Sequence, residues 1–264
     1  MYVSGKSIND LIQIANGELC VMQNWIASNK LTINQSKSHY VIFNRNKTFP
    51  INMNPLLIGN HIMRREHETK FLGITIDEKL TWKSHTLSIR MKINKHCGIL
   101  HQTKNVLTAK ALKQIYYSLI YPHLTYCQAV WGATYQSFIE SLMIVQKKVI
   151  RVIDGLKKYD HTNDVFKRLK LLKINDINVY FISVYVFNSL NLQGNNIFNY
   201  RDNRNYQLRN SNLLRIPQID SFQSKSCILY HGVAIWNSLP LFIRNIGNIN
   251  IFKRKLKEYL LSKY

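Results

Sequence analysis

The sequence lacks the residue patterns from which most catalytic and metal centres are built. It has no Asp-Asp pair, no Gly-rich phosphate loop, no Walker sequence and no nucleophile elbow. Two-metal nucleotidyl transfer needs two or more carboxylates that converge on Mg²⁺, and phosphate loops need their glycines. A catalytic set could be assembled only from scattered Ser, His, Asp and Cys residues, which any long sequence permits. We therefore predict no metal site in this chain.

Cysteine is scarce, and long apolar runs are missing. The four cysteines show no Cys-x-x-Cys spacing, which argues against a zinc knuckle and a disulfide framework. No segment has the ~18 apolar residues of a membrane-spanning helix. The longest apolar run, residues 177–190, is interrupted by Asn178 and Ser183 and is expected to be a core helix. The N-terminus lacks a charged-then-apolar signal pattern. We expect an intracellular protein of the nucleus or cytoplasm that is not secreted and has no membrane partner.

Acidic residues are also scarce. The chain has 36 Lys and Arg against 14 Asp and Glu, a formal net charge of +22, which attracts polyanions such as nucleic acid or an anionic membrane surface. Residues 79–139 contain no Asp or Glu but eight Lys and Arg. A solvated basic face explains surface lysines but not the missing acids, because soluble helices mix both signs. A surface that contacts phosphates excludes carboxylates, so this interval favours nucleic-acid binding.

The first 80 residues have the pattern of a small α+β unit. Ser7 is a good N-cap, and apolar residues at three-four spacing predict a helix to about Ile26. Residues 71–76 are apolar and partly alternating, which predicts a buried strand ending at an Asp77-Glu-Lys turn. The other expected strands are 38–43 and the hairpin strands 56–58 and 62–64, joined at Gly59-Asn60.

Beyond residue 80 the pattern is helical. Thr81 is expected to cap a helix over about 82–104, whose apolar stripe is Ile89, Ile93, Cys97 and Leu100. Further helices are expected at about 108–121 (stopped by Pro122), 136–153, 165–172, 176–190, 222–239 and 251–261, with a loop or short strands at 194–212. The fold class predicted is α+β and predominantly α-helical, with a small antiparallel sheet.

Several motifs, in one consistent order along nearly the whole chain, resemble a known family. They are Leu31-Thr-Ile-Asn-Gln-Ser-Lys37-Ser, Phe71-Leu-Gly-Ile, Asp77-Glu-Lys-Leu-Thr-Trp with His85, Tyr117-Ser-Leu-Ile-Tyr-Pro-His-Leu-Thr-Tyr-Cys, Val130-Trp-Gly, Gln146-Lys-Lys-x-x-Arg151 and Ile235-Trp-Asn-Ser-Leu-Pro240. Each motif is weak, but together they are specific. The chain resembles the C-terminal part of a reverse transcriptase, an RNA-directed DNA polymerase, from a jockey-type non-LTR retrotransposon.

The resemblance implies an architecture and a set of site residues. Residues 1–80 would be the end of a polymerase palm, 81–160 a helical thumb and 161–264 a helical C-terminal extension. Lys37 matches a lysine that could act as a general acid towards pyrophosphate, although a bare surface lysine is the alternative. The residues expected to contact an RNA/DNA template-primer are Phe71, Leu72 and Gly73, as a primer grip, and Lys83, Arg90, Lys92, Lys95 and Lys104.

One departure from the family pattern sets the functional expectation. The metal-binding Phe/Tyr-Ala-Asp-Asp turn of the family would precede Met1-Tyr-Val, so the chain lacks it, along with the fingers. We expect a truncated polymerase that cannot extend a primer alone, whereas the complete family enzyme uses Mg²⁺. Two alternatives stay open. One is a non-catalytic nucleic-acid-binding or interaction module that docks on a full-length element-encoded protein; the other is a product that does not fold.

Overall fold

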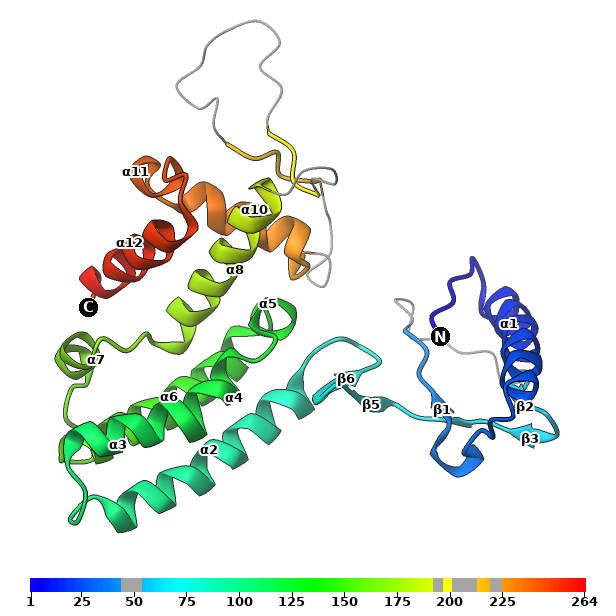
Figure 1. The fold of residues 1–264 in the computed structure, drawn as a ribbon, viewed down its shortest axis with the longest axis horizontal. Coiled ribbons are helices and arrows are strands. Elements are labelled where there is room, and N and C mark those ends of the chain that lie inside the picture. Colours follow the sequence, from blue (N-terminus) through cyan, green and yellow to red (C-terminus); the bar gives the residue numbers. More distant parts are fainter. Residues whose placement is uncertain (44–53, 192–196, 201–212, 219–224) are drawn as a thin grey trace, which may run out of the picture. The chain divides into compact units, whose positions relative to one another are not determined.

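The computed structural model describes residues 1–43, 54–191, 197–200, 213–218 and 225–264 of the chain (Figure 1). It contains two compact units, Met1–Leu80 and Thr81–Tyr264. The second unit includes both segments, 81–160 and 161–264, that the resemblance assigns to a thumb and an extension. The two units are described separately below.

The first unit is organised around helix α1 (Ile8–Ser28). The Ser7 hydroxyl accepts a hydrogen bond from the Asp10 N–H at 3.1 Å, so the predicted cap is confirmed. One face of α1 packs on the predicted hairpin, formed by β2 (Leu57–Ile58) and β3 (His61–Ile62). The buried cluster between them consists of Ile12, Ala15, Leu19, Leu56 and Ile58.

The other strands of this unit are short. β1 (His39–Tyr40), expected at 38–43, has only two residues and pairs in parallel with β4 (Arg64–Arg65). A single 3₁₀ turn, η1 (Gln35–Lys37), precedes β1. β5 (Glu68–Phe71) and β6 (Ile74–Asp77) form an antiparallel pair. Within the described residues, each sheet has two strands.

The prediction of one buried strand over residues 71–76 was wrong. Leu72 (φ 47°) and Gly73 (φ 86°) form the turn between β5 and β6, and positive φ at both central positions is the backbone of a tight hairpin turn. Leucine is not a turn-forming residue, so the sequence did not reveal this turn. Phe71 and Leu72 are 61% and 73% exposed, and of these residues only Ile74 is buried.

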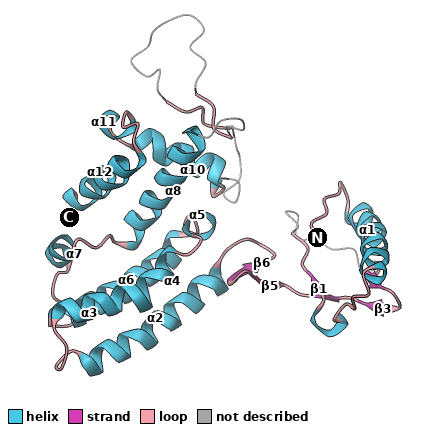
Figure 2. Cartoon of the chain, in the orientation of Figure 1, coloured by secondary structure: helices cyan, strands magenta, loops and turns pink. Residues whose placement is uncertain are grey.

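The second unit is helical in its described parts (Figure 2). Its helices are α2 (Lys83–Thr103), α3 (Ala109–Ile115), α4 (Tyr121–Thr125), α5 (Gln128–Trp131), α6 (Gln136–Asp154), α7 (Asn163–Leu169), α8 (Ile174–Asn191), α10 (Ile228–Ser238), α11 (Leu241–Arg244) and α12 (Ile249–Ser262). Helix α2 packs along α6, while α8 packs on α4, α5, α6, α10 and α12. The fully buried Tyr116, Trp131, Phe166 and Phe252 fill the core of this unit.

Several helix predictions are confirmed. The core helix expected at 176–190 is α8, and the helices expected at 136–153 and 251–261 are α6 and α12. Gly155, with φ 69°, ends α6 in the left-handed conformation that glycine favours. The segment expected as a loop or short strands, 194–212, is described only at residues 197–200, where Tyr200 forms a β-bridge with Leu214. Residues 201–212 lie outside the described residues, as do residues 222–224 at the expected start of α10.

None of the described helices combines the length and hydropathy needed to cross a membrane.

Several helix boundaries differ from the prediction. The helix expected at 165–172 ends at Leu169, and the helix expected over 222–239 is α10, which begins at Ile228. The N-cap of α2 is Trp82, with φ 62°, and the Thr81 hydroxyl accepts a hydrogen bond from the Lys83 N–H at 3.4 Å. Pro122 does not stop the preceding helix, because α3 continues through a π-helical turn, η2 (Tyr116–Ile120), into α4. The Tyr121 N–H bonds to the Tyr116 carbonyl, and the register change places Pro122 in the first turn of α4, where its missing N–H costs least.

Three polar contacts join helices that are distant in the sequence; the two made by Gln146 are buried, and the one made by Asn178 is partly buried. The Gln146 amide donates to the Tyr116 hydroxyl at 3.0 Å, and its oxygen accepts from the Ile174 N–H at 2.9 Å. The Oδ1 atom of Asn178 on α8 lies 3.0 Å from the Nε2 atom of His231 on α10. These contacts fix how the helices of the second unit pack, since buried polar groups need partners.

Candidate nucleic-acid interface

The outer face of α2 is set by what the helix buries. Ile89, Ile93, Cys97 and Leu100 are buried, so the predicted apolar stripe is confirmed. The stripe packs on α6. Because an α-helix turns once in 3.6 residues, the other positions of α2 face outward or lie on the edges of this contact.

The predicted basic residues of α2 lie on two flanks of that outer face. Lys83 and Arg90 are seven positions apart (90 − 83) and share one flank, while Lys92 lies roughly 160° from Arg90 around the helix axis, next to Lys95. All four are exposed, whereas Lys104, at the C-cap, is half-buried. Among the described residues, none of these cations forms an ion pair.

An apolar strip separates the two flanks. Leu87 and Met91, one turn apart, are 44% and 64% exposed. Gly98, about two turns beyond Met91, has open space where a side chain would stand. The outer face of α2 therefore presents a narrow apolar centre with cations on both sides, in an interval that contains no acidic residue.

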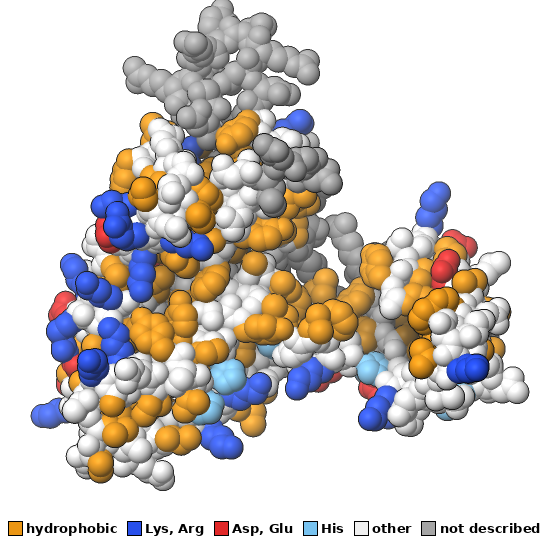
Figure 3. Space-filling model, viewed as in Figure 1, with side chains coloured by type: hydrophobic (Ala, Val, Ile, Leu, Met, Phe, Trp, Pro, Cys, Tyr) orange, Lys and Arg blue, Asp and Glu red, His pale blue; other side chains and the backbone are white. Residues whose placement is uncertain are grey.

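A pair of histidines, not identified from the sequence, lies beside Lys92. The rings of His96 on α2 and His123 on α4 stack, with centroids 5.6 Å apart and an interplanar angle of 14°. The pKa of His123 is lowered by burial and then by the positive charges of Lys92 and His96. On the face seen in Figure 3, pale-blue His side chains lie beside blue Lys and Arg side chains over this part of the second unit. The local potential is therefore positive.

His85 belongs to the core and not to this surface. It is 6% exposed, and its ring meets Trp131 edge-on at 5.5 Å. Burial, with a further contribution from Lys92, lowers the pKa of His85 to about 4, so the ring is neutral at pH 7. The matched motif Leu-Thr-Trp-x-x-His thus supplies packing at the start of α2.

The remaining predicted site residues lie in the first unit. Phe71, Leu72 and Gly73 are exposed at the β5–β6 turn, and Lys37 is exposed at the end of η1. His39 connects these segments, because its Nδ1 lies 3.3 Å from the Lys37 carbonyl oxygen and its Nε2 lies 2.6 Å from the Thr69 hydroxyl. Lys37 is therefore tied to β5 through its backbone, while its ammonium group is accessible.

Several of the described carboxylates have local structural contacts. Glu78 accepts from Arg65 at 3.0 Å, Asp77 accepts from the Lys79 N–H at 3.2 Å, and Asp154 pairs with Arg168. In the described part of the chain, no group of three or more His, Cys, Asp and Glu could hold a metal ion; Asp202 and Asp220 lie outside it. The described donors do not fit the Mg²⁺ site that the resemblance implies for a complete polymerase.

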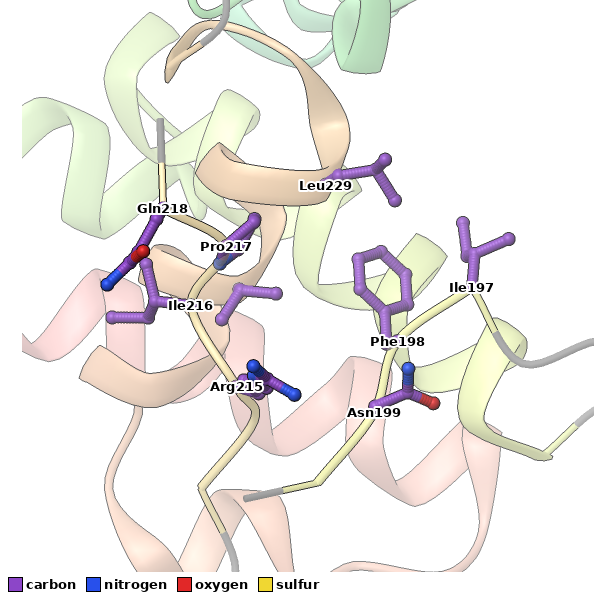
Figure 4. A pocket seen from close by; sticks show the side chains of 9 residues that line it. Ile197, Phe198, Asn199, Arg215, Ile216, Pro217, Gln218 and Leu229 are labelled. Carbon is purple, nitrogen blue, oxygen red and sulfur yellow. The ribbon is translucent and has the colours of Figure 1, made fainter. Parts of the chain in front are cut away.

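A concave site of a different kind lies at α10. A pocket of about 510 Å³ is formed by residues 197–199, residues 215–218 and two residues of α10, Leu229 and Val233 (Figure 4). Six of the nine lining residues are apolar, and Arg215 is the one charged residue among the nine. The Asn237 side chain holds one edge of this region, because it bonds to the Leu214 N–H at 2.8 Å and to the Leu214 carbonyl at 2.9 Å.

Comparison with known proteins identifies relatives of part of the chain. It is 32% identical over 164 residues to the RNA-directed DNA polymerase from mobile element jockey of Drosophila melanogaster, and 29% identical over 163 residues to that of Drosophila funebris; each match covers 60% of this chain and 17% of the relative. It is 28% identical over 156 residues to the probable RNA-directed DNA polymerase from transposon X-element of Drosophila melanogaster, and this match covers 58% of this chain and 17% of the relative.

These similarities confirm the resemblance to polymerases of jockey-type non-LTR retrotransposons. The chain spans only about a sixth of the length of the relatives it matches. No protein-family model and no solved structure matches the chain. The assignment of palm, thumb and extension therefore stays a prediction.

Proposed function

We propose that the chain is the part of an RNA-directed DNA polymerase that binds the template-primer, and that the outer face of α2 contacts the nucleic acid. The observation that carries the proposal is the pair of cationic flanks on either side of the Leu87–Met91 strip. Residues 79–139, which include this face, have no acidic residue that would repel phosphates.

The shape of the face suits a duplex groove. With its side chains an α-helix is about 10–12 Å across, so cations on opposite flanks can reach the two phosphate backbones that border a groove. The apolar strip would then face sugar and base edges. An A-form hybrid presents a wide and shallow minor groove, which such a helix can approach without being inserted deeply.

The residues of the first unit would take supporting roles. Exposed Phe71 and Leu72 offer apolar contact to a primer end, and the accessible ammonium of Lys37 could donate a proton to leaving pyrophosphate. Mg²⁺ would be held by carboxylates elsewhere in a complete polymerase, because the described carboxylates of this chain do not fit it. Purified chain should therefore fail to extend a primer on an RNA template with Mg²⁺. We place its action in the nucleus or cytoplasm.

A salt titration of hybrid binding tests the proposal. Log K falls as log salt rises, and each lost phosphate contact makes this negative slope shallower by about 0.9. Lys92→Gln with Lys95→Gln should therefore reduce its magnitude by about 1.8, and Lys83→Gln with Arg90→Gln by a similar amount. The matched control is Lys6→Gln with Lys30→Gln, which removes the same charge from exposed sites of the first unit. Equal slopes for wild type and all three variants would refute the proposal.

The alternative function is an interaction module, and the exposed Leu87 and Met91 favour it. A hydrophobic contact with a full-length element-encoded protein would hardly respond to salt, because its main driving force is burial of apolar area. Leu87→Ser with Met91→Ser would then abolish association with that protein while leaving the salt slope of hybrid binding unchanged.

A further inference from the structure

The stacked rings of His96 and His123, which we call the histidine pair, extend the Lys92–Lys95 flank of α2 onto α4. His96 lies four positions after Lys92 (96 − 92), so their side chains are neighbours on the helix surface. His96 also lies roughly 40° around the axis from Lys92, toward the buried stripe. There its ring stacks on that of His123, with centroids 5.6 Å apart, and α2 packs on α4. Nitrogen-bearing groups from two helices therefore meet beside the basic face.

Packing alone does not explain why these two half-buried positions carry imidazole rings. The Nδ1 atom of His96 is buried and, among the described residues, has no hydrogen-bond partner. A buried polar atom without a partner costs free energy, and an apolar ring would pack without that cost. Because an orphaned buried N–H is the rarer case, we assign the ring proton to Nε2, which leaves the Nε2–H as the donor of this ring.

The surroundings of the histidine pair lack an anion. Residues 79–139, which supply α2 and α4, contain no carboxylate. Burial and then the charges of Lys92 and His96 hold the pKa of His123 below its ordinary 6.5, so its ring is mostly neutral at pH 7. An anionic ligand would supply the missing charge and favour the imidazolium form. The titratable groups of the elements packed on α2 and α4 include the following, none of which acts on His123: Tyr117 of η2, Glu140, Lys148 and Asp154 of α6, and Tyr180 of α8.

We propose that the histidine pair, together with Lys92, binds a phosphate of the nucleic-acid backbone and takes up a proton from solvent when it does so. The His96 Nε2–H and the Lys92 ammonium donate to the phosphate oxygens, and the added proton makes the histidine contact charge-assisted. Because the two rings are close, a second proton is repelled by the first. The partner class rests on the proposed function, to which the pair adds a contact on α4 and a dependence on pH.

Proton uptake during hybrid binding tests the proposal. The binding enthalpy should be measured at pH 7 in two buffers of different ionisation enthalpy, because the buffer supplies the proton. Wild type should take up a fraction of one proton. Its affinity for an RNA–DNA hybrid should rise as the pH falls from 8 to 6, by at most about tenfold for each pH unit. Absence of uptake by wild type would overturn the proposal.

Variants then assign the proton to the pair. His96→Gln with His123→Gln should abolish the uptake and make the salt slope shallower by about 0.9, the value of one phosphate contact. His61→Gln with His161→Gln, at exposed positions outside α2 and α4, is the matched control and should keep both. His123→Phe keeps a stacked ring on His96, so it should fold even if the double variant does not, and its uptake should be smaller than that of wild type.

Two outcomes separate this inference from the proposed function. If Lys92→Gln with Lys95→Gln makes the slope shallower while the histidine variants keep the slope and uptake of wild type, the pair serves packing only, and the α2 proposal stands. If the slope is the same in every variant, the α2 proposal fails as well. Inorganic phosphate provides the other comparison: uptake with phosphate but not with the hybrid would show a site for free phosphate and would refute the nucleic-acid assignment.

Discussion

Acidification should destabilise the second unit through His85. This histidine is buried at the start of α2 against Trp131, and its pKa in the folded protein is lowered to about 4 from the ordinary 6.5. The unfolded chain therefore binds the proton more readily than the folded chain does. The contribution of neutral His85 to the free energy of unfolding is therefore fully present above pH 6.5 and is lost as the pH falls toward 4.

The size of the effect follows from the pKa interval. A difference of one pH unit corresponds to about 1.36 kcal/mol, so between pH 7 and pH 4 protonation of His85 should lower the free energy of unfolding by about 3 kcal/mol. This is a large share of the roughly 5–15 kcal/mol that stabilises a typical domain. Carboxylates also titrate in this range, so wild type alone does not isolate the contribution.

The variant His85→Phe isolates it, because phenylalanine keeps an aromatic ring against Trp131 but does not titrate. Urea unfolding should be followed by tryptophan fluorescence, since three of the four tryptophans, Trp82, Trp131 and Trp236, lie in the second unit. Between pH 7 and pH 4, wild type should lose about 3 kcal/mol more than His85→Phe. His101→Phe, at an exposed position of the same helix, is the matched control. Parallel losses in wild type and His85→Phe would refute the reasoning.

Two further substitutions test packing in the second unit. Gly132→Ala should lower the free energy of unfolding, measured by urea titration, by about 2 kcal/mol. The reason is that a Cβ at position 132 would collide with Gln128, whose carbonyl oxygen would lie 2.5 Å away. The control Gly98→Ala, in open space on α2, should raise the free energy of unfolding by up to about 1 kcal/mol. Asn237→Ala should cost about 1–2 kcal/mol through its two hydrogen bonds to Leu214, and a urea midpoint equal to that of wild type would contradict this.

The sequence reveals local features of this fold well and long-range ones poorly. Ser7, the α1 stripe and the Gly59-Asn60 hairpin follow from spacing and turn chemistry, and all were predicted. The Leu72-Gly73 turn was missed because leucine rarely adopts a positive φ, and tertiary context overrides that preference. Pro122 was expected to end a helix because proline disrupts a helix interior. The π turn that accommodates Pro122 has no recognisable sequence pattern, so it was not predicted.

The candidate sites show the same division. The absence of acidic residues from 79–139 marked α2 as a basic surface, but only helical geometry separates Lys83 and Arg90 from Lys92 and Lys95. The stacked rings of His96 on α2 and His123 on α4 join two positions that no sequence pattern connects. Residues of this kind can be found only when the packing of α2 on α4 is known.

The charge of the chain is better explained by binding than by folding. A net charge of +22 opposes the compact state through self-repulsion, and in the described part of the chain the ion pairs do not involve the α2 cations. The fold is held instead by buried apolar and aromatic side chains such as Tyr116, Trp131 and Phe252. Because the unpaired cations weaken the fold, their neutralisation should stabilise the free protein and weaken hybrid binding together, whereas cations that served only the fold would lower stability when removed.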